Sequence, residues 1–583
     1  MQGSRLTLLV IALALAGHGA RAQLTDAPII RYEDTAHPEF GEAGMVSSQH
    51  ELSSAVGAEI LAQGGNAVDA AIAVGFSLAV TLPRAGNLGG GGFMLIHHAE
   101  SGRDIAIDYR EQAPIRASRD MYLDEDGNID EDKLPFSYLS VGVPGTVSGL
   151  FRAHQEFGSL PWRKLVEPAI RQAREGITVS FDMATLLKAR KNRLCGNEAA
   201  CSYFYKEGGV PYEPGELFVQ RDLADTLKRI ARFGPDGFYK GKTAALIAAD
   251  MAAHGGLVDE ESLAAYEAVV REPLRGTYRG YEITTMPPPS SGGVHLIQML
   301  NILEHFPVRE LGAGGADNVH LLTESARLAY ADRAVHLGDP DFYDVPVEWL
   351  TSKQYGRELA EGIDLEQARD SRDVGAGTPP KAESPDTTHY SVIDGEGNIV
   401  ATTTTLNFSF GAGVAVSGAG FLLNNEMDDF VAKPGVPNAF GLLGGEANAV
   451  EPLKRPLSSM TPTIIFDDGE PRFAIGSPGG SRIITTVLQT VVNVIDHEMN
   501  LAEAINAPRM HHQWMPDVLQ LETGFSPDTV EILKRRGHEV RITRYSMGSV
   551  QAVGMRDGIF VGASDLRRPN AGSIGPSRVP DRR

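Results

Sequence analysis

Residues 385–392 read PDTTHYSV, and they lie where two kinds of sequence meet. Before them, residues 366–386 are polar and rich in proline and glycine, with no apolar period, which predicts an exposed segment. After them, residues 388–393 and 398–406 are β-branched and alternating and flank a DGEG turn, which predicts a β-hairpin. Thr387 therefore lies at the boundary between an exposed segment and a buried strand.

Thr387 allows two interpretations at this point. It is either an ordinary residue at the start of a strand, which spacing alone favours, or a nucleophile. A threonine hydroxyl is a poor nucleophile unless a base takes its proton. Cleavage of the bond between Asp386 and Thr387 would give Thr387 a free α-amine with an unperturbed pKa of about 7.7–8. Such an amine suits general-base chemistry near neutral pH, so both interpretations stay open.

The composition of the chain restricts its class. The 583 residues are 42% hydrophobic, which supports a folded core and allows roughly two to four domains or one composite unit. Lys and Arg total 53 against 75 Asp and Glu, and the formal charge of −22 disfavours non-specific nucleic-acid binding, which needs clustered cations. Two cysteines exclude a disulfide scaffold and a cysteine-rich metal or iron–sulfur site.

Residues 1–22 have the pattern of a secretory signal peptide. Arg5 gives a positive start, residues 6–16 are nearly all apolar, and ARA at 20–22 is a small-x-small cleavage site. This apolar run is too short to span a bilayer, and no later stretch is long enough to do so. We therefore expect an exported protein, periplasmic or secreted, without a stable membrane anchor; the alternative is an uncleaved anchor.

Export gives a meaning to Cys195 and Cys201, which lie six residues apart in a stretch that contains glycine and asparagine. An oxidising compartment would let them close a small loop. We therefore predict a local disulfide, the alternative being two unpaired thiols.

Regular structure can be predicted from periodicity. The alanine-rich residues 55–79 predict two helices separated by Gly64 and Gly65, with Asn66 as the N-cap of the second. Apolar residues at three- and four-residue spacing predict further helices at 146–176, 182–191, 222–254 and 316–336. Strand-like runs occur at 414–424, 462–466, 472–476 and 559–563.

Several stretches resemble familiar motifs but lack the spacing or the flanking elements that those motifs require. The glycine run at 86–92 leads into a strand-like FMLIHH rather than a helix, so it does not predict a dinucleotide loop. DEDGN at 124–128 lacks the glycine and glutamate positions of a calcium loop and predicts a hairpin turn. The side chains of the adjacent histidine pairs at 97–98 and 511–512 would diverge on a strand, so neither pair predicts a metal site. Ser477 does not lie in a GxSxG sequence, so a nucleophile elbow is not predicted. We therefore expect no metal and no cofactor.

Ordered motifs along most of the chain nevertheless resemble one family, the γ-glutamyltransferases (γ-glutamyltranspeptidases), which are N-terminal-nucleophile hydrolases. The motifs are GGNAVDAA (64–71), NLGGGGF (87–93), DYRE (108–111), PPPSSGG (287–293), TTHYSV (387–392), LNNEMDDF (423–430), RPLSSM (455–460) and GSPGG (476–480). The resemblance implies an α+β fold, the four-layer αββα sandwich. It also implies a precursor that cuts itself between Asp386 and Thr387. The products are a large subunit, 23–386, and a small subunit, 387–583, which form a heterodimer with one composite domain.

The resemblance assigns the chemistry to Thr387. Its hydroxyl attacks the γ-amide of glutathione or another γ-glutamyl compound, and the ester passes its acyl group to water, an amino acid or a short peptide, with ping-pong kinetics. Thr405 matches the second threonine of the family, which positions the nucleophile. Gly479 and Gly480 match the residues whose backbone N–H groups stabilise the oxyanion. Without the resemblance these three would be an ordinary strand residue and a Pro-Gly turn.

The γ-glutamyl group carries both an α-carboxylate and an α-ammonium, so its pocket needs both signs of charge. Arg110 matches the residue that holds the carboxylate in a planar fork, and Ser458 and Ser459 add hydroxyl donors. The residues that match the ammonium-binding positions of the family are Asn407, Glu426 and Asp429.

Residues 434–449 are rich in proline and glycine and resemble the lid loop of many members of the family. Phe440 stands where some members have tyrosine, so a phenol hydrogen bond is not available there. Two alternatives remain: an acylase for glutaryl-type cephalosporin side chains with the same fold, and a non-catalytic secreted binding protein. A glutaryl group has no ammonium, so the acidic set argues against the first alternative.

Overall fold

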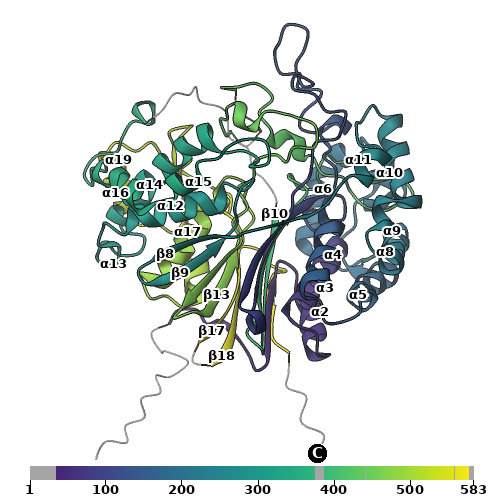
Figure 1. Cartoon of the computed structure of the whole chain (residues 1–583), viewed down its shortest axis with the longest axis horizontal. Helices are drawn as coiled ribbons and strands as arrows, with labels where there is room; N and C mark the ends of the chain where they lie inside the picture. Colours follow the sequence, from purple (N-terminus) through teal and green to yellow (C-terminus); the bar gives the residue numbers. More distant parts are fainter. Residues whose placement is uncertain (1–33, 375–386, 437, 440, 557, 577–583) are drawn as a thin grey trace, which may run out of the picture.

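The computed structural model describes residues 34–374, 387–436, 438–439, 441–556 and 558–576 (Figure 1). The predicted signal peptide at 1–22, the cleavage-site residue Asp386 and the lid residue Phe440 lie outside these residues.

Two seven-stranded antiparallel sheets form the centre of the part of the chain that the structure describes. The first sheet has the order β1 (Glu39–Gly41), β18 (Ile559–Ser564), β17 (Gln551–Arg556), β13 (Glu470–Gly476), β12 (Thr463–Asp467), β9 (Tyr281–Thr285) and β8 (Leu274–Tyr278). The second has the order β19 (Gly572–Ile574), β2 (Gly44–Ser48), β10 (Thr387–Asp394), β11 (Ile399–Thr405), β3 (Gly91–His98), β4 (Arg103–Tyr109) and β7 (Val269–Arg271). The sheets pack face to face, with β10 against β13 and β17.

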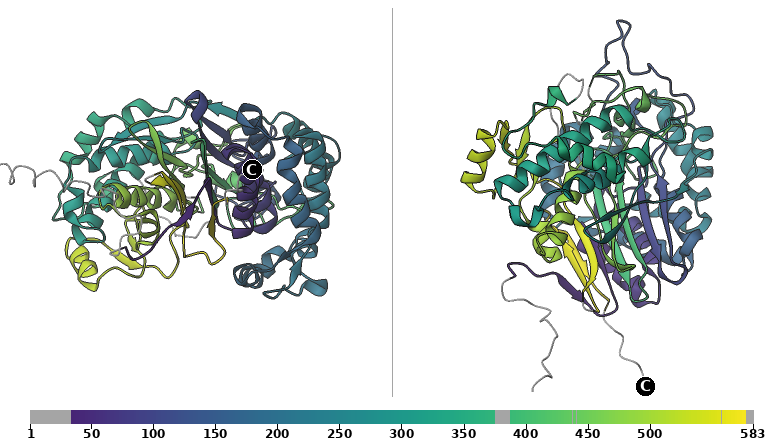
Figure 2. Two further views of the ribbon diagram at one scale, coloured as in Figure 1. Left: turned by 90° about the horizontal axis from the view of Figure 1, so that it is seen from below. Right: turned by 60° about the vertical axis from the view of Figure 1, so that its left-hand side comes forward.

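Helices cover the outer face of each sheet (Figure 1). The layer outside the second sheet contains α2 (Glu51–Ala62), α3 (Ala67–Thr81), α4 (Thr146–Phe157), α5 (Trp162–Glu175), α6 (Phe181–Leu194), α7 (Glu198–Phe204), α8 (Arg221–Phe233), α9 (Asp236–Tyr239), α10 (Gly241–Ala253) and α11 (Glu260–Ala264). The layer outside the first sheet contains α12 (Gly292–Leu303), α13 (Val308–Leu311), α14 (Ala316–His336), α15 (Val347–Leu350), α16 (Lys353–Glu361), α17 (Arg482–Ile495), α18 (Leu501–Asn506) and α19 (Pro527–Arg535). Figure 2 shows the same separation from below. The predicted αββα sandwich is confirmed.

Small strands lie outside the two main sheets. One sheet joins β14 (Met510–His511), β15 (Leu519–Leu521) and β16 (Val540–Ile542), and another pairs β5 (Ile177–Thr178) with β6 (Leu217–Phe218).

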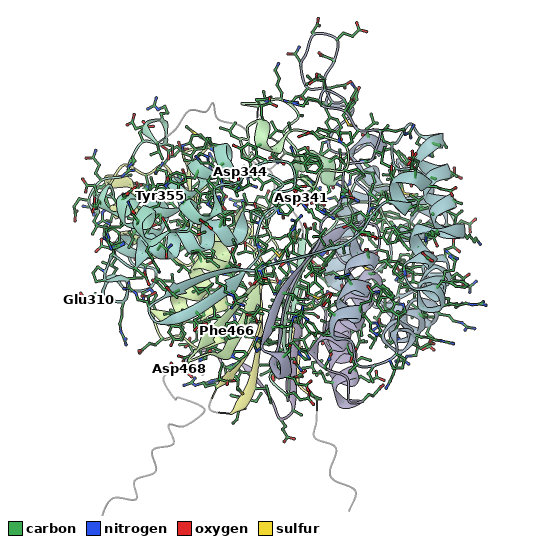
Figure 3. The ribbon with its side chains drawn as sticks, viewed as in Figure 1. Glu310, Asp341, Asp344, Tyr355, Phe466 and Asp468 are labelled. Atoms are coloured by element: carbon green, nitrogen blue, oxygen red, sulfur yellow. A yellow bond between two sulfur atoms is a disulfide. The ribbon has the colours of Figure 1, made fainter. Side chains whose placement is uncertain are left out.

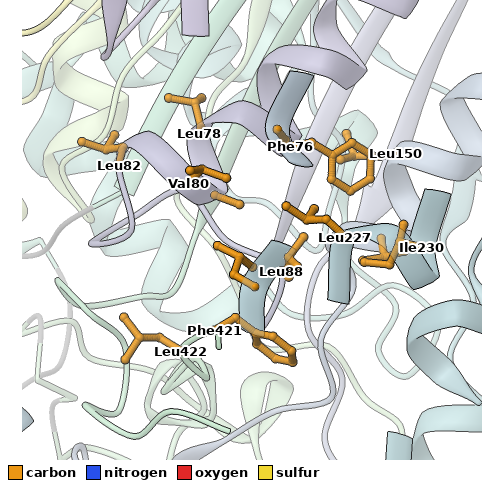
Figure 4. Close-up of a cluster of buried hydrophobic side chains, with 14 of the residues drawn as sticks. Phe76, Leu78, Val80, Leu82, Leu88, Leu150, Leu227, Ile230, Phe421 and Leu422 are labelled. Carbon is orange, nitrogen blue, oxygen red and sulfur yellow. The ribbon is translucent and has the colours of Figure 1, made fainter. Parts of the chain in front are cut away.

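Helix α3 shows why the sequence forms these layers. Asn66 caps it: the Asn66 side chain accepts from the Asp69 N–H, and the Asp69 carboxylate accepts from the Asn66 N–H. Gly64 has a positive φ of 84°, which lets the chain turn between α2 and α3. Every residue of α3 is buried, as expected for a helix that is apolar all round. Its side chains meet those of α4 and α8 in the core of Figure 4.

Most predicted elements are confirmed. The expected helical regions contain α2 to α6, α8, α10 and α14, and the hairpin is β10 and β11. The strand-like runs at 462–466, 472–476 and 559–563 fall in β12, β13 and β18. Cys195 and Cys201 form the predicted disulfide, which joins the end of α6 to α7. The DEDGN stretch is the predicted turn, with Asp124 N–H donating to Asn128 O at 2.8 Å.

The predicted strand at 414–424 is wrong. Gly418 and Gly420 have positive φ values of 74° and 81°, so the chain reverses there, and the Val416 N–H donates to the Phe421 O at 3.0 Å. The β-branched and apolar residues that suggested a strand are buried as a turn against the core around α3. Only isolated bridges form here, between Ala415 and Leu422 and between Leu423 and Gly89. Local periodicity cannot distinguish such a buried turn from a strand.

Candidate active site

The β10–β11 hairpin brings the two predicted catalytic threonines together. Thr387 is the first residue of β10, and the register pairs it with Thr405, the last residue of β11. Their Oγ1 atoms are 3.4 Å apart, and both residues are buried. The backbone N–H of Asn407 donates to Thr405 Oγ1 at 2.8 Å, which fixes that hydroxyl. The hairpin alone thus places one threonine to orient the other.

A cavity opens beside this pair. Thr387 lines it, and the other polar lining residues are Arg110, Arg333, Thr405, Asn407, Glu426, Asp429, Ser458, Ser459 and Ser481. Gly480 and apolar side chains, including Leu442 and Leu457, complete the wall. The structure therefore brings together every predicted site residue that it describes, with Gly479 next in sequence to the lining Gly480.

Gly479 and Gly480 lie between β13 and the N-terminus of α17. Gly480 has φ 54° and Gly479 φ 139°, a backbone conformation that favours glycine. Both precede a helix of 14 residues, and backbone N–H groups at such a position attract negative charge. This backbone can therefore stabilise an oxyanion that forms beside Thr387.

Arg110 follows β4 directly, and its side chain is almost completely buried, 1% exposed. Its guanidinium bonds to the carboxylates of Glu426 and Asp429. It also donates two hydrogen bonds to backbone carbonyls: from Nε to Pro456 O at 3.1 Å, and from Nη2 to Leu457 O at 3.3 Å. The predicted carboxylate-binding and ammonium-binding residues are therefore paired with one another in the free site.

Burial makes this charged cluster titrate abnormally. Desolvation raises the pKa of Glu426 and Asp429, although the Arg110 charge opposes it. Desolvation also raises the pKa of Glu111, whose carboxylate lies 3.7 Å from the Arg110 guanidinium, to about 7. Burial lowers the pKa of Arg110, but the three acids outweigh this and raise it above its usual value. Glu111 therefore gains a proton as the pH falls through about 7, which changes the net charge of the cluster.

Further salt bridges fix the surroundings of Arg110. Arg271 on β7 donates from Nε to Asp108 at 2.8 Å and from Nη2 to Asp341 at 2.8 Å. Asp341 is labelled in Figure 3. Asp108 precedes Arg110 by two residues and accepts from its N–H at 3.0 Å. These contacts hold the end of β4, and so they hold the start of the Arg110 side chain.

Ser458 and Ser459 are held by the predicted PPPSSGG motif. The Ser458 N–H donates to Pro289 O at 2.9 Å, and the Ser291 N–H donates to Ser458 O at 2.8 Å. A motif about 170 residues away in sequence thus supports the backbone of Ser458 and Met460, which line the cavity. Asn407 has φ 73° and donates from Nδ2 to Asn425 O at 3.0 Å, so its side chain is oriented by the segment that carries Glu426.

Two buried residues of this site, Arg333 and Glu111, are not among the site residues predicted from the sequence. Arg333 lies on α14 and is only 5% exposed. A signal was present: it continues the apolar stripe of Leu322, Ala326 and Tyr330, where a charged residue is unexpected. Glu111 stood in the DYRE motif, but nothing in a single sequence shows that it is buried.

One group of possible metal ligands occurs among the described residues: His320, Glu324 and His538. His320 Nε2 is 2.7 Å from Asp364 O, which can only accept, so Nε2 carries the proton and Nδ1 accepts from His538 Nε2 at 2.7 Å. Glu324 is paired with Arg327 at 3.2 Å. Each of these three side chains therefore already has a hydrogen-bond or ion-pair partner within the protein. In each of the histidine pairs at 97–98 and 511–512, the two side chains diverge as predicted and form hydrogen bonds with different residues.

In the described part of the chain, the longest helices lack the unbroken apolar length that a membrane span requires.

Comparisons with known proteins show the family of this chain. The sequence profile of the family described as Gamma-glutamyltranspeptidase matches residues 53–575. The glutathione hydrolase proenzyme of Escherichia coli (strain K12) is 51% identical over 565 residues, which cover 96% of this chain and 97% of that protein. The Acylase ACY 1 proenzyme of Pseudomonas sp. (strain SE83) is 40% identical over 538 residues, which cover 91% and 93%. The crystal structure of cephalosporin acylase from Bacillus halodurans superimposes with a TM-score of 0.83 at 27% identity and covers 95% of this chain and all of that one. The chain therefore belongs to the gamma-glutamyltranspeptidase family.

Proposed function

We propose that the chain is a γ-glutamyltransferase and glutathione hydrolase whose nucleophile is the N-terminal Thr387 of a self-cleaved precursor. The observation that carries the proposal is the pairing of Thr387 with Thr405 at the end of one hairpin, beside a cavity that holds both signs of charge. A hydrolase of this kind needs a positioned hydroxyl, an oxyanion site and a zwitterion pocket. Each has a counterpart among the residues around that cavity.

The proposed cleavage uses the Thr387 hydroxyl. The Oγ attacks the carbonyl carbon of Asp386, the C–N bond breaks, and the Thr387 nitrogen takes a proton to become a free amine. Water then hydrolyses the Asp386 ester and restores the hydroxyl. The products are a large subunit, 23–386, and a small subunit, 387–583, which remain together as a heterodimer. The long register shared by β10 with β2 of the large subunit supports their association.

Acyl transfer follows from the new amine. It accepts the hydroxyl proton as Oγ attacks the γ-carbonyl of the donor, and the oxyanion is stabilised by the backbone N–H groups of Gly479 and Gly480. The amine then gives its proton to the leaving nitrogen, and a γ-glutamyl-threonine ester remains. Water, or the amine of an amino acid or short peptide, attacks that ester in the second half-reaction.

Donor recognition is assigned to the charged end of the cavity. The donor ammonium is placed against Asn407, Glu426 and Asp429, and its carboxylate against Arg110, Ser458 and Ser459. Because Arg110 already pairs with two of these acids, the incoming zwitterion replaces existing ion pairs with equivalent ones. Charge balance in the buried site is thereby kept. The proposal includes export to the periplasm or medium, and a lid at 434–449 whose residue Phe440 lies outside the described residues.

A second candidate is supported by the similarity to acylase ACY 1 and to cephalosporin acylase. A glutaryl donor has the carboxylate but not the ammonium. It would leave the acids of the cluster without a cationic ligand, which is why we place this function second.

One experiment separates the candidates. Purified wild-type protein is assayed for p-nitroaniline release from γ-glutamyl-p-nitroanilide and from glutaryl-p-nitroanilide, each with and without glycylglycine. We expect turnover of the γ-glutamyl donor, faster with glycylglycine if transfer competes with hydrolysis. A preference for the glutaryl donor would establish the second candidate. No turnover of either donor by cleaved protein would favour a binding protein and contradict the proposal.

A further inference from the structure

Arg333 is a buried cation at the cavity without an acidic partner. It is 5% exposed and lines the cavity together with Thr387. Its Nε donates to Ser291 Oγ at 2.9 Å, and its Nη2 donates to Ser459 Oγ at 3.2 Å. Within the residues that the structure describes, no carboxylate lies at ion-pair distance from this guanidinium. The two acids that line the same cavity, Glu426 and Asp429, bond to Arg110 instead.

The two arginines of the cavity therefore differ. Arg110 is neutralised by acids before any ligand arrives. Burial lowers the pKa of Arg333 to about 10, although the Tyr330 and Asp429 side chains oppose the shift, so Arg333 remains protonated at pH 7. A buried charge without a counter-ion is costly. An anionic group of a ligand would relieve that cost.

The contact with Arg333 orients the Ser459 hydroxyl. A guanidinium has donors only, so Ser459 Oγ must accept from Arg333. The Ser459 proton then points elsewhere, and no acceptor for it occurs in the described chain. Ser459 lines the cavity, so its hydroxyl is oriented to donate to a ligand there. Ser291, the second contact of Arg333, also accepts from it and donates to Ser458 O at 2.8 Å.

We propose that Arg333 is a positioning residue that makes the site specific for donors with a free α-carboxylate. It acts by orienting the Ser459 hydroxyl toward that carboxylate and by supplying a positive charge that forms no ion pair with an acid of the site. This inference rests on the proposed function, because it names the donor class of the same site.

The test compares two donors: γ-glutamyl-p-nitroanilide and the same anilide with its α-carboxylate converted to a carboxamide. Hydrogen bonds to charged groups contribute about 1.5–3 kcal/mol, so Arg333→Met is expected to raise the KM of the carboxylate donor about 10-fold or more. The kcat is expected to stay within about threefold, because Arg333 does not contact the Thr387 hydroxyl. The KM of the carboxamide donor is expected to change less than about twofold. Arg333→Lys is expected to recover part of the loss.

A double variant tests whether Arg333 acts through Ser459. Because the two side chains are in contact, Arg333→Met combined with Ser459→Ala is expected to be little worse than Arg333→Met alone. Additive losses would overturn the positioning role.

Arg327 supplies the matched control. It lies on the same helix, is also buried, and bonds to Ser371 and Asp517 rather than lining the cavity. Arg327→Lys is expected to lower thermal stability and leave the ratio of the two KM values unchanged.

An equal change in KM for both donors in Arg333→Met would overturn the inference, since it would indicate a structural effect. If that variant gives no cleaved protein, Arg333→Lys and Ser459→Ala provide the same comparison. Wild-type protein that turns over neither donor contradicts the proposed function itself. If the wild-type protein is active but the Arg333 and Ser459 variants change the KM of both donors equally, only this inference is contradicted.

Discussion

The two ends of the cavity are built in opposite ways. The end that carries Thr387 and Thr405 consists of hydroxyls and backbone N–H groups, and one hairpin sets its geometry. The other end consists of buried charges, Arg110 with Glu426 and Asp429, from segments more than 300 residues apart. Reaction and recognition therefore depend on different residues of one cavity. Changes at the neutral end should alter kcat, and changes at the charged end should alter KM.

The largest expected effect is at the neutral end. Thr387→Ala removes the hydroxyl on which both cleavage and acyl transfer depend, so γ-glutamyl-p-nitroanilide hydrolysis is expected to fall at least about 10³-fold. The next residue of β10 gives the control, because the Thr388 hydroxyl has no hydrogen-bond partner in the described residues. Thr388→Ser should keep most of the activity. Similar losses in both variants would mean that the loss in Thr387→Ala is not specific to its hydroxyl.

At the charged end, Arg110→Lys keeps the charge but loses the planar fork. We expect the KM of the γ-glutamyl donor to rise about 10-fold or more, with a smaller change in kcat, in steady-state assays of cleaved protein. Arg103→Lys, at the exposed start of the same strand, serves as the control. A KM for Arg110→Lys within about twofold of wild type would remove Arg110 from donor recognition.

Some of this arrangement could be predicted from local sequence, and some could not. The hairpin, the Asn66 cap and the Cys195–Cys201 disulfide depend on neighbouring residues, and each was predicted. The strand expected at 414–424 failed because the glycines there reverse the chain, although its apolar residues are buried.

The charged end could be predicted only through the resemblance to a family. No spacing within DYRE indicates that Arg110 meets Glu426, because sheet register and the path of the chain from residue 406 to 426 bring them together. The burial of Glu111 and the contact of Arg333 with Ser459 arise in the same way. The residues of this site meet only in the tertiary structure, so no local sequence pattern predicts their contacts.

A smaller effect is expected from pH. Burial raises the pKa of Glu111 to about 7, so the cluster gains a proton as the pH falls through 7 and attracts the donor ammonium less. The donor KM, measured from pH 5.5 to 8.5, should therefore rise several-fold toward the acidic end. Glu111→Gln should flatten this KM profile, whereas titration of the Thr387 amine, which acts on kcat, should persist. Identical KM profiles in both proteins would exclude Glu111 as the titrating group.

The smallest effect on activity is expected far from both ends. Neither cysteine lines the cavity, so the double variant Cys195→Ser, Cys201→Ser should keep its kcat/KM. The loop that the disulfide closes is short, and its loss should lower the free energy of unfolding by about 2 kcal/mol in denaturant titrations. A fall in activity without a fall in stability would mean that α6 and α7 take part in the site.

Intact-mass analysis with N-terminal sequencing of the purified protein tests the central claim most directly. The account predicts two chains from wild-type protein, the smaller of which begins at Thr387, and one uncut chain from Thr387→Ala. A wild-type protein that turns over γ-glutamyl donors as a single uncut chain, or a small chain that begins at another residue, would contradict it.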